Sequence, residues 1–494
     1  MQLERFIWRA LPLWAVVCFS CGGSSSRVGG PEPPASQQTG SGGSSATHVD
    51  AGAPSTGGGG APGTGGGSTL GCADIFDQGS LQTYSFDISA DQMAAINDEF
   101  HNVTALESGA SFAVYHPITF HLNGETITNA AVKLHGQSSW DQTVTLDGNR
   151  AKMQFDVSFD QVDPLGSFHG VSKLVFDMPR DDWTFMHNRL VQAWLRQVGV
   201  MAPCSVNARL NINGAYYGLY VLEQGVGSGT VSAFFPSNPH GDLWKGAVQA
   251  ETNTASPNVA RLKQFRSAAD LASLTAIMDV PHSLTTWAAE ALVNDADGYY
   301  GGFHNFYLYD QGAAGFLFLP QDTDAVLDWL DTFDLPGATD HPIYWWSSRA
   351  QPAPTPGDKW MLVLGDAAER VHYADAIEGL LARWNVTQIQ GWIDSWSRQI
   401  AAAAASDPHA WATPAQVQTA TQTARDIVAK RPVYLQTFVD CEHGVAGAAS
   451  DADGDGYNWC DECDDGNPDV HPGAKEICGN GVDDDCNGFV DDGC

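Results

Sequence analysis

Basic residues are scarce in this sequence. Lys and Arg number 24 against 58 Asp and Glu, which gives a formal net charge of −34 over 494 residues. Because proteins bind nucleic acids mainly through Lys and Arg on phosphates, this balance argues against unaided binding of nucleic acid. It also argues against attraction to an anionic membrane surface. An acidic chain repels polyanions and attracts cations, so the distribution of the acidic residues becomes the question.

Long apolar runs are missing as well. The apolar residues 11–20 follow Arg5 and Arg9 and are too few to span a bilayer, which is the pattern of an export signal. The run ends at Cys21, and the arrangement resembles a bacterial lipoprotein signal in which Cys21 carries the lipid. We therefore predict a signal peptide over 1–21 and an exported lipoprotein of the outer membrane or cell surface, with secretion as the alternative. Contact with the membrane would come through the lipid anchor alone.

Large apolar side chains are rare in residues 22–71, which consist mainly of Gly, Ser, Pro, Ala and Thr. Such a segment cannot bury enough apolar surface to fold, so we predict a disordered linker. Export permits disulfides. With Cys18 in the signal and Cys21 lipidated, eight cysteines remain from Cys72 onward. Their connectivity cannot be read from the sequence; Cys72 with Cys204 is the simplest pair to expect.

Residues 72–440 have the pattern of one large domain with strands first and helices later. Asn123-Gly124 and Asn213-Gly214 each separate two strand-like segments and indicate hairpins. Apolar residues at helical spacing predict a helix over 183–198 that ends at Gly199. The fold class expected from this order is α+β. Further helices are predicted over 283–294, 357–372, 373–383 and 417–430.

Oxygen-bearing side chains gather where several of these elements end. Asp297 lies in a Gly- and Tyr-rich loop after a helix, Asn305 precedes one strand, and Asp322 follows the next. Hard oxygen ligands beside a separate Asp suit magnesium–nucleotide chemistry. Lys152, or else Lys133, could pair with the phosphates. The competing interpretation is that these residues are caps and turn formers, and that the acidic residues from 324 to 334 form a solvated face.

Six ordered motifs between residues 132 and 324 resemble the CotH kinase family, named after spore-coat protein H. The segment 212–223 matches most specifically, through its Asn-Gly, Gly-Leu-Tyr and terminal Glu223. The resemblance implies an atypical protein-kinase-like domain that transfers the ATP γ-phosphate to Ser or Thr of surface or coat proteins. The motifs are Val132–Ser139, Asn149–Phe155, Ile212–Glu223, Gly241–Lys245, Asn294–Tyr309 and Leu319–Asp324.

Roles follow from the resemblance by position. Asp297 would be the catalytic Asp, with Asp295 as its rival, and Asp322 would bind Mg²⁺. The further magnesium candidates are Asn305 and Asp324. Lys152 would meet the ATP phosphates, and Glu223 would hold metal or orient Lys152.

Two departures from the family pattern bear on activity. His135 replaces the usual Arg, so one positive charge depends on pH. Gln321 replaces the usual Trp before Asp322. An exported protein also meets little ATP. The alternative function is therefore a non-catalytic envelope or spore-coat component on a kinase-like scaffold.

Acidic residues are concentrated in a second predicted module, 441–494. Residues 451–494 hold 14 Asp and Glu and a single Lys. Asp451, Asp453, Asp455 and Glu462 take positions 1, 3, 5 and 12 of a calcium loop, with Gly456 at position 6 and Tyr457 at position 7. Cysteines and a proline leave no room for the second helix of an EF-hand, so we predict a disulfide-pinned loop that binds Ca²⁺.

The same tail resembles the metal-binding motif of the surface protein MopE. Cys460 and Cys463 have a spacing that also occurs in zinc sites, so zinc or copper is the alternative to calcium. So few apolar residues would make the module depend on metal and disulfides for its fold.

Overall fold

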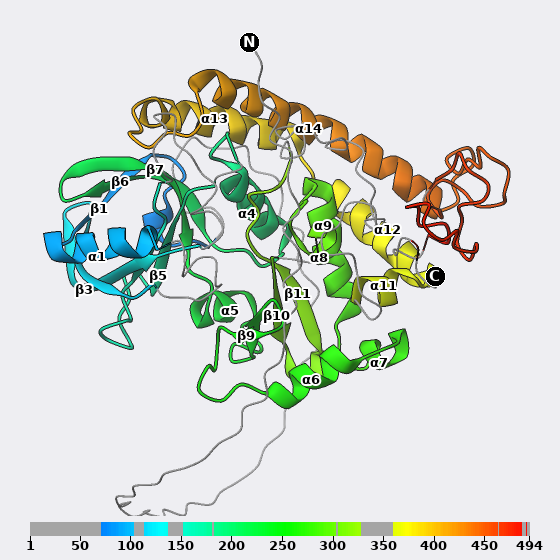
Figure 1. Ribbon diagram of the computed structural model, residues 1–494, viewed down its shortest axis with the longest axis horizontal. Coiled ribbons are helices and arrows are strands. Elements are labelled where there is room, and N and C mark those ends of the chain that lie inside the picture. Colours follow the sequence, from blue (N-terminus) through cyan, green and yellow to red (C-terminus); the bar gives the residue numbers. More distant parts are fainter. Residues whose placement is uncertain are drawn as a thin grey trace, which may run out of the picture. The chain divides into compact units, whose positions relative to one another are not determined.

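The computed structural model describes most of the predicted domain and tail (Figure 1). The predicted signal peptide and linker, with Cys21, lie outside the described residues, apart from Gly71. Within the described ranges, no helix combines the length and the apolar character that a membrane crossing requires. The described residues are 71–102, 113–136, 152–179, 182–302, 305–327, 359–462, 464–486 and 491.

The N-terminal half of the domain is a closed β-barrel. Its strands pair in the order β1-β2-β3-β4-β5-β7-β6, and a parallel pairing of β1 with β6 closes the ring. All the other pairings in the barrel are antiparallel. The strands are β1 (Gln82–Asp87), β2 (His116–Leu122), β3 (Glu125–Leu134), β4 (Phe155–Ser158), β5 (Lys173–Asp177), β6 (Ser205–Ile212) and β7 (Ala215–Gln224).

Both predicted hairpins are confirmed in this barrel. Asn123-Gly124 joins β2 to β3, and Asn213-Gly214 joins β6 to β7. All four residues have positive φ, between 50° and 87°, which two-residue hairpin loops require and Asn and Gly tolerate best. Aromatic rings fill the barrel in edge-to-face contacts, such as Phe86 on Phe155 with ring centroids 5.6 Å apart.

The C-terminal half is mainly helical around a small sheet. The sheet has the order β11-β10-β8-β9. Its strands are β8 (Leu243–Lys245), β9 (Gln249–Ala250), β10 (Phe306–Asp310) and β11 (Phe316–Pro320). Short helices α5 (Ser228–Phe234), α6 (Val259–Ser267), α7 (Leu271–Thr275) and α9 (Tyr299–Gly302) connect to it. The longer helices are α8 (Val280–Val293), α11 (Lys359–Leu364), α12 (Ala367–Leu381), α13 (Val386–Ala405) and α14 (Pro414–Glu442).

Strands therefore precede helices, as the α+β prediction states. Several helix boundaries differ from the predicted ones, most of all for α14, which runs from Pro414 to Glu442 where 417–430 was predicted. The helix predicted over 183–198 is α4 (His187–Val198); it does end at a left-handed Gly199, but a turn occupies its predicted first residues. The predicted break at 372–373 lies instead at Asp366, whose side chain accepts hydrogen bonds from the first turn of α12 and so starts that helix.

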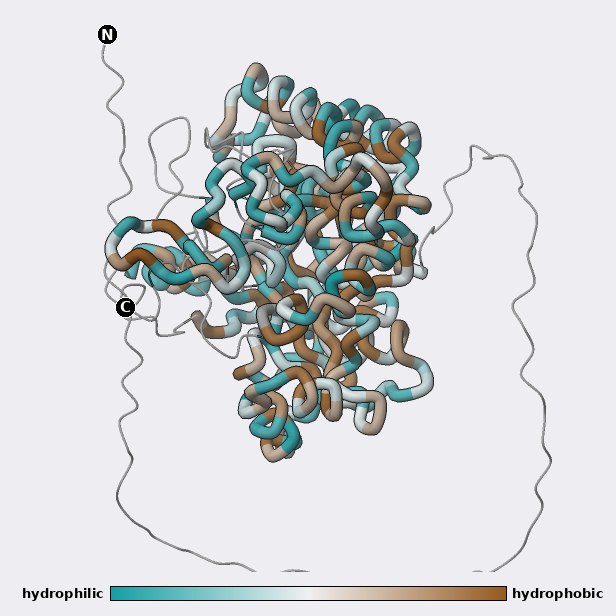
Figure 2. Tube along the Cα trace, turned by 90° about the vertical axis from the view of Figure 1, so that its right-hand side faces the viewer, coloured by the Kyte–Doolittle hydropathy of each residue, from teal (hydrophilic) through white to brown (hydrophobic). Residues whose placement is uncertain are grey.

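One hydrophobic core runs through both halves. It includes Phe120 in the barrel, Trp194 in α4 and Trp287 in α8, all buried. Figure 2 shows hydrophobic segments toward the middle of the trace and alternating colours along the long helices. α1 (Ala90–Phe100) packs on β2 and β3, and α13 packs against α14, α4 and β7.

Disulfides close the domain at two places. The expected pair Cys72–Cys204 is present, with sulfur atoms 2.07 Å apart. Cys441 on α14 pairs with Cys460 in the tail. Because α14 continues to Glu442, the boundary predicted between residues 440 and 441 falls inside this helix.

Candidate functional site

Asp297 and Asn305 lie together, as the sequence predicted. α8 ends at Asn294, which is left-handed (φ 56°) and turns the chain into the loop that carries Asp297. The Asn305 side-chain amide donates to the Asp297 carboxylate at 2.8 Å, and both side chains are half-buried. Asn305 itself has φ 40°, a conformation that Asn tolerates better than most residues.

Asp322 follows β11, the strand paired with β10 that begins directly after Asn305. The Gln321 amide donates to the Asn305 carbonyl at 2.8 Å and so holds the two strand ends together. Solvent reaches the Asp322 side chain, yet the surrounding protein removes enough water to raise the pKa of its carboxyl. The Asp297 charge raises this pKa further. The two carboxylates therefore act on each other across the loop.

The barrel adds two more carboxylates to this group. Asp177 ends β5 and Glu223 lies near the end of β7, on paired strands. α4 positions both, because Gln192 donates to Glu223 at 2.7 Å and Asn188 donates to Asp177 at 3.4 Å. Burial followed by the Asp322 charge raises the pKa of Asp177 to about 7. Burial, then Asp177 and Asp322, raises the pKa of Glu223 well above its usual value.

We call Asp177, Glu223, Asp297 and Asp322 the carboxylate cluster. Its members come from both halves of the domain, and the raised pKa values of Asp177, Glu223 and Asp322 report charges that lack full compensation. Sequence reasoning found Asp297 and Asp322 and proposed Glu223 as a metal or Lys152 partner, but missed Asp177. A signal for it existed, since Asp177 directly follows the apolar run Leu174-Val175-Phe176, as Asp322 follows an apolar strand.

Positive groups stand beside the carboxylate cluster. His135 follows β3, and its Nδ1 lies 2.8 Å from an Asp156 oxygen. Lys133 lies 3.4 Å from the other Asp156 oxygen. Burial would raise the pKa of Asp156, but His135 and nearby lysines outweigh it and lower that pKa to about 2. Burial alone would lower the pKa of His135, but the charges of Asp156 and Asp177 outweigh it and raise that pKa. In turn, the positive charges of His135 and Lys245 stabilise the ionised form of Asp322.

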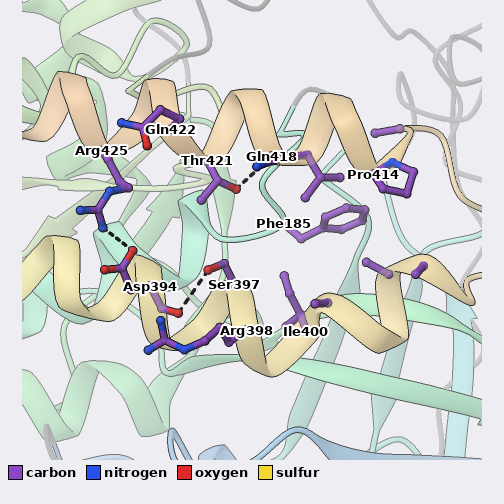
Figure 3. Close-up of a pocket in the computed structure, with 15 residues that line it drawn as sticks. Phe185, Asp394, Ser397, Arg398, Ile400, Pro414, Gln418, Thr421, Gln422 and Arg425 are labelled. Atoms are coloured by element: carbon purple, nitrogen blue, oxygen red, sulfur yellow. Dashed lines mark hydrogen bonds and ion pairs between the residues drawn. The ribbon is translucent and has the colours of Figure 1, made fainter.

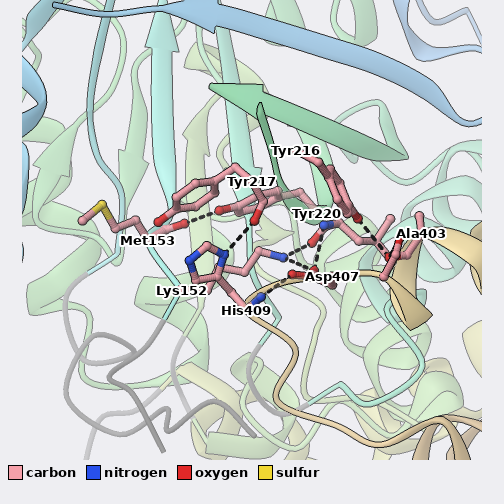
Figure 4. Close-up of polar contacts among 10 residues, drawn as sticks. Lys152, Met153, Tyr216, Tyr217, Tyr220, Ala403, Asp407 and His409 are labelled. Carbon is pink, nitrogen blue, oxygen red and sulfur yellow. Dashed lines mark hydrogen bonds and ion pairs between the residues drawn. The ribbon is translucent and has the colours of Figure 1, made fainter. Parts of the chain in front are cut away.

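Lys152 has partners that the sequence did not predict (Figure 4). Its ammonium forms an ion pair with Asp407 at 2.7 Å, and both side chains are fully enclosed. The ammonium also donates to the Leu219 carbonyl and lies 4.1 Å from the centre of the Tyr220 ring. Gly218 makes room, since a Cβ there would come within 2.4 Å of Lys152 Cε. The partner of Glu223 is accordingly Gln192 and not Lys152.

The other predicted residues of this region have distinct environments. Asp295 is completely buried, and burial together with Glu290 and Asp297 raises its pKa well above the usual value. Gly298 is required beside it, because a Cβ would lie 2.7 Å from the Asp295 carboxyl carbon. Asp324 accepts a hydrogen bond from His187 through its backbone carbonyl at 2.7 Å. Solvent therefore reaches Asp297 but not Asp295, its rival for the catalytic role.

The predicted loop of the tail brings its carboxylates together. Ligand oxygens of Asp451, Asp453 and Asp455 lie within 4.8 Å of one another, and Gly456 has the positive φ, 103°, that the turn needs. The Glu462 side chain is 6% exposed, and neither of its oxygens has a hydrogen-bond partner. Burial, then Asp455 and Asp453, raises the pKa of Glu462 to about 8. One outer oxygen each of Asp453 and Asp455 is also buried without a partner.

Tyr457 contributes a backbone amide that donates to Asp455 at 2.8 Å, and its ring stacks on His471. A second acidic group, formed by Glu476, Asp483 and Asp485, lies later in the tail. Among the residues that the structure describes, the carboxylate cluster holds no three ligand atoms within 4.8 Å of one another. The loop of residues 451–462 therefore brings three of its ligand oxygens closer together than the carboxylate cluster does.

Two family models match separate parts of the chain, and neither covers Asp451, Asp453 or Asp455. The family model described as CotH kinase protein matches residues 132–233 and 259–435, more than half of the chain. The Cu-binding MopE model, which describes a metal-binding motif, matches residues 462–492. No curated protein matches the chain. The chain thus belongs to the CotH kinase protein family and ends in a metal-binding motif of the MopE type.

Proposed function

We propose that this protein is an exported kinase that transfers the γ-phosphate of ATP, with Mg²⁺, to Ser or Thr of surface or coat proteins. The observation that carries the proposal is the solvent-accessible carboxylate cluster built from both halves of a CotH domain. Like charges that raise one another's pKa values are costly to hold together, and a bound cation would relieve that cost.

Mg²⁺ suits the arrangement better than a cation that needs a complete protein cage. Magnesium is commonly held by one or two carboxylates together with substrate phosphates. No three ligand atoms of the described cluster lie within 4.8 Å of one another, so its side chains form no complete cage and a metal held there would need further ligands such as phosphate oxygens. Asp322 and Asn305 are the residues that would hold the metal, and the metal would neutralise charge on the phosphates.

Asp297 is the group placed to accept a proton. It is half-buried and held by Asn305, so its carboxylate can orient a substrate hydroxyl. In the transfer, the hydroxyl oxygen bonds to the γ-phosphorus, the bond to the bridging oxygen breaks, ADP leaves, and the hydroxyl proton passes to Asp297. His135 and Lys245, which stabilise ionised Asp322, would supply the positive charge near the phosphates that Lys152 cannot supply from its ion pair with Asp407.

The test uses full-length protein, labelled ATP, Mg²⁺ and a mixture of cell-surface proteins. Asp297→Asn and Asp322→Asn should lose phosphate incorporation while keeping the wild-type melting temperature. Asp98→Asn, an exposed change on α1, is the matched control and should stay active. Incorporation that survives unchanged in both cluster variants would refute this assignment.

The enclosed Lys152 is the observation that favours the alternative, a non-catalytic envelope or coat protein. That reading predicts no phosphate incorporation and no rise in melting temperature with ATP and Mg²⁺. The lipid anchor at Cys21, the outer-membrane location and the absence of nucleic-acid partners rest on the sequence pattern and the net charge. Labelling with a fatty-acid analogue, lost in Cys21→Ser, would test the anchor.

We also propose that the tail binds Ca²⁺ through Asp451, Asp453, Asp455, the Tyr457 carbonyl and Glu462. The buried, unpartnered oxygens of Glu462 support this, because hard oxygen ligands favour calcium over zinc or copper. Calorimetry should show Ca²⁺ binding that Glu462→Gln weakens and the exposed change Asp469→Ala leaves intact. Tighter binding of Zn²⁺ or Cu²⁺ by the disulfide-bonded protein would overturn the choice of metal.

A further inference from the structure

A groove of about 630 Å³ lies between α13 and α14, away from both acidic sites (Figure 3). The C-terminal half of α13 is rich in alanine, and Ala401, Ala404 and Ala405 line the groove with side chains too small to fill it. Phe185, from the loop before α4, lies between the two helices. The volume is in the range of pockets that hold small molecules.

The groove is apolar at one end and polar at the other. Phe185, Ile400 and Pro414 line the apolar end, where the Phe185 ring packs on Trp411 with centroids 4.6 Å apart. Arg398 and the ion pair of Arg425 with Asp394 line the polar end. A ligand that matches both ends has an apolar body and one polar head.

The charge at the polar end of the groove favours a ligand with an anionic head group. Arg425 is neutralised by Asp394, whereas Arg398 is exposed and has no hydrogen bond or ion pair among the described residues. The local balance of these three groups is one positive charge, in a chain whose net charge is −34. A carboxylate on the ligand would complete the pairing.

The ends of the groove limit the length of its occupant. The Arg425–Asp394 ion pair crosses from α14 to α13, so it blocks the groove at the polar end. Phe185 and Pro414 lie at the other end. A helix of a partner would have to pass these barriers, whereas a compact single-chain molecule fits between them.

From the charge and the closed ends, we infer that the α13–α14 groove is a binding site for a single-chain amphiphilic carboxylate. Its alkyl body packs on Phe185 and the alanines, and its carboxylate pairs with Arg398. This inference is independent of phosphate transfer, since none of the lining residues belongs to the carboxylate cluster.

The experiment is calorimetry of the full-length protein with dodecanoate, at pH 8, below micelle formation and without calcium. One molecule should bind per chain, and affinity should fall by up to about fourfold for each methylene removed in decanoate and octanoate. Dodecyltrimethylammonium, which has the same tail and the opposite charge, should bind at least about tenfold more weakly. Equal binding of the two amphiphiles, or binding that ignores chain length, would overturn the proposal.

Matched variants locate the site. Ala404→Leu should abolish binding because it fills the groove, whereas Ala402→Leu, on the same helix but outside the lining, should bind normally. Arg398→Gln should bind dodecanoate at least about tenfold more weakly than the wild type. Arg266→Gln, an exposed change on α6, should bind it as the wild type does. Self-association that Ala404→Leu abolishes would assign the groove to a second copy of the chain and refute the amphiphile.

Discussion

The carboxylate cluster and the loop of residues 451–462 that we propose to bind calcium, called the calcium loop below, are both acidic, but they are built in opposite ways. The loop takes all its carboxylates from residues 451–462, and Glu462 is left buried without a hydrogen-bond partner. The cluster takes its carboxylates from four separate segments, and α4 holds two of them through Asn188 and Gln192. A local loop can be organised by the ion itself. A cluster assembled by the fold is positioned in advance, which is what transfer chemistry requires.

The largest expected effect tests whether the two acidic sites have separate roles. Asp297→Asn should lower phosphate transfer by about a thousandfold or more, because proton acceptance and orientation are lost together. Asp453→Asn in the calcium loop should leave transfer within about twofold in the same assay. Equal losses in the two variants would mean that the two acidic sites do not have separate roles.

Asp407 represents a third kind of acidic environment and sharpens the comparison, because it is buried and paired with Lys152. Lys152→Met should lower the free energy of unfolding by about 3–5 kcal/mol, since it leaves the Asp407 charge enclosed without its partner. Denaturant unfolding followed by circular dichroism measures this loss. Lys152→Met combined with Asp407→Leu should recover most of it, and no recovery would show that Lys152 stabilises the fold by another route.

Calcium should act on the tail alone. At a Ca²⁺ concentration 100 times the Kd, binding should stabilise the tail by about 2.7 kcal/mol. Hydrogen exchange should show protection in residues 451–462 that chelation removes, and no change in the barrel strands. A change in the hydrogen exchange of β5 and β7 on chelation would show that the tail and the carboxylate cluster form one cooperative unit.

The smallest effect expected for a single step, a change of one pH unit, concerns Glu290, the buried carboxyl beside Asp295. Burial raises the pKa of Glu290 to about 8 in the folded protein. A raised carboxyl pKa means that the folded state holds a proton that the unfolded state has released, so stability falls as pH rises from about 4.5 to about 8. The slope should be on the order of 1 kcal/mol per pH unit. Because other raised carboxyls contribute a slope of the same sign, Glu290→Gln should reduce the total slope by about this amount in melts between pH 5 and 9. His282→Gln, an exposed change on the same helix, should leave the slope unchanged.

Sequence reasoning succeeded where the signal is local. The Asn-Gly hairpins, the short step from Asp297 to Asn305 and the convergence of Asp451, Asp453 and Asp455 each depend on neighbours within about a dozen residues. It failed for Lys152, because the deciding partner, Asp407, lies 255 residues away. Asp177 was missed although its position after a strand was visible. The start of α12 could also have been found, since Asp366 and Glu369 form a typical helix-start pattern.

One element, α14, contributes to three regions of the molecule. Its first turns form a wall of the groove, and Arg431 donates to the Ala291 carbonyl and to the Tyr300 hydroxyl, close to the loop of Asp297. Its last turn carries Cys441, bonded to Cys460 inside the calcium loop. The domain and tail are therefore not separable at the boundary suggested by composition. A protein cut at residue 440 would lose a disulfide and the end of a helix, so dissection into modules would alter each part that it sets out to isolate.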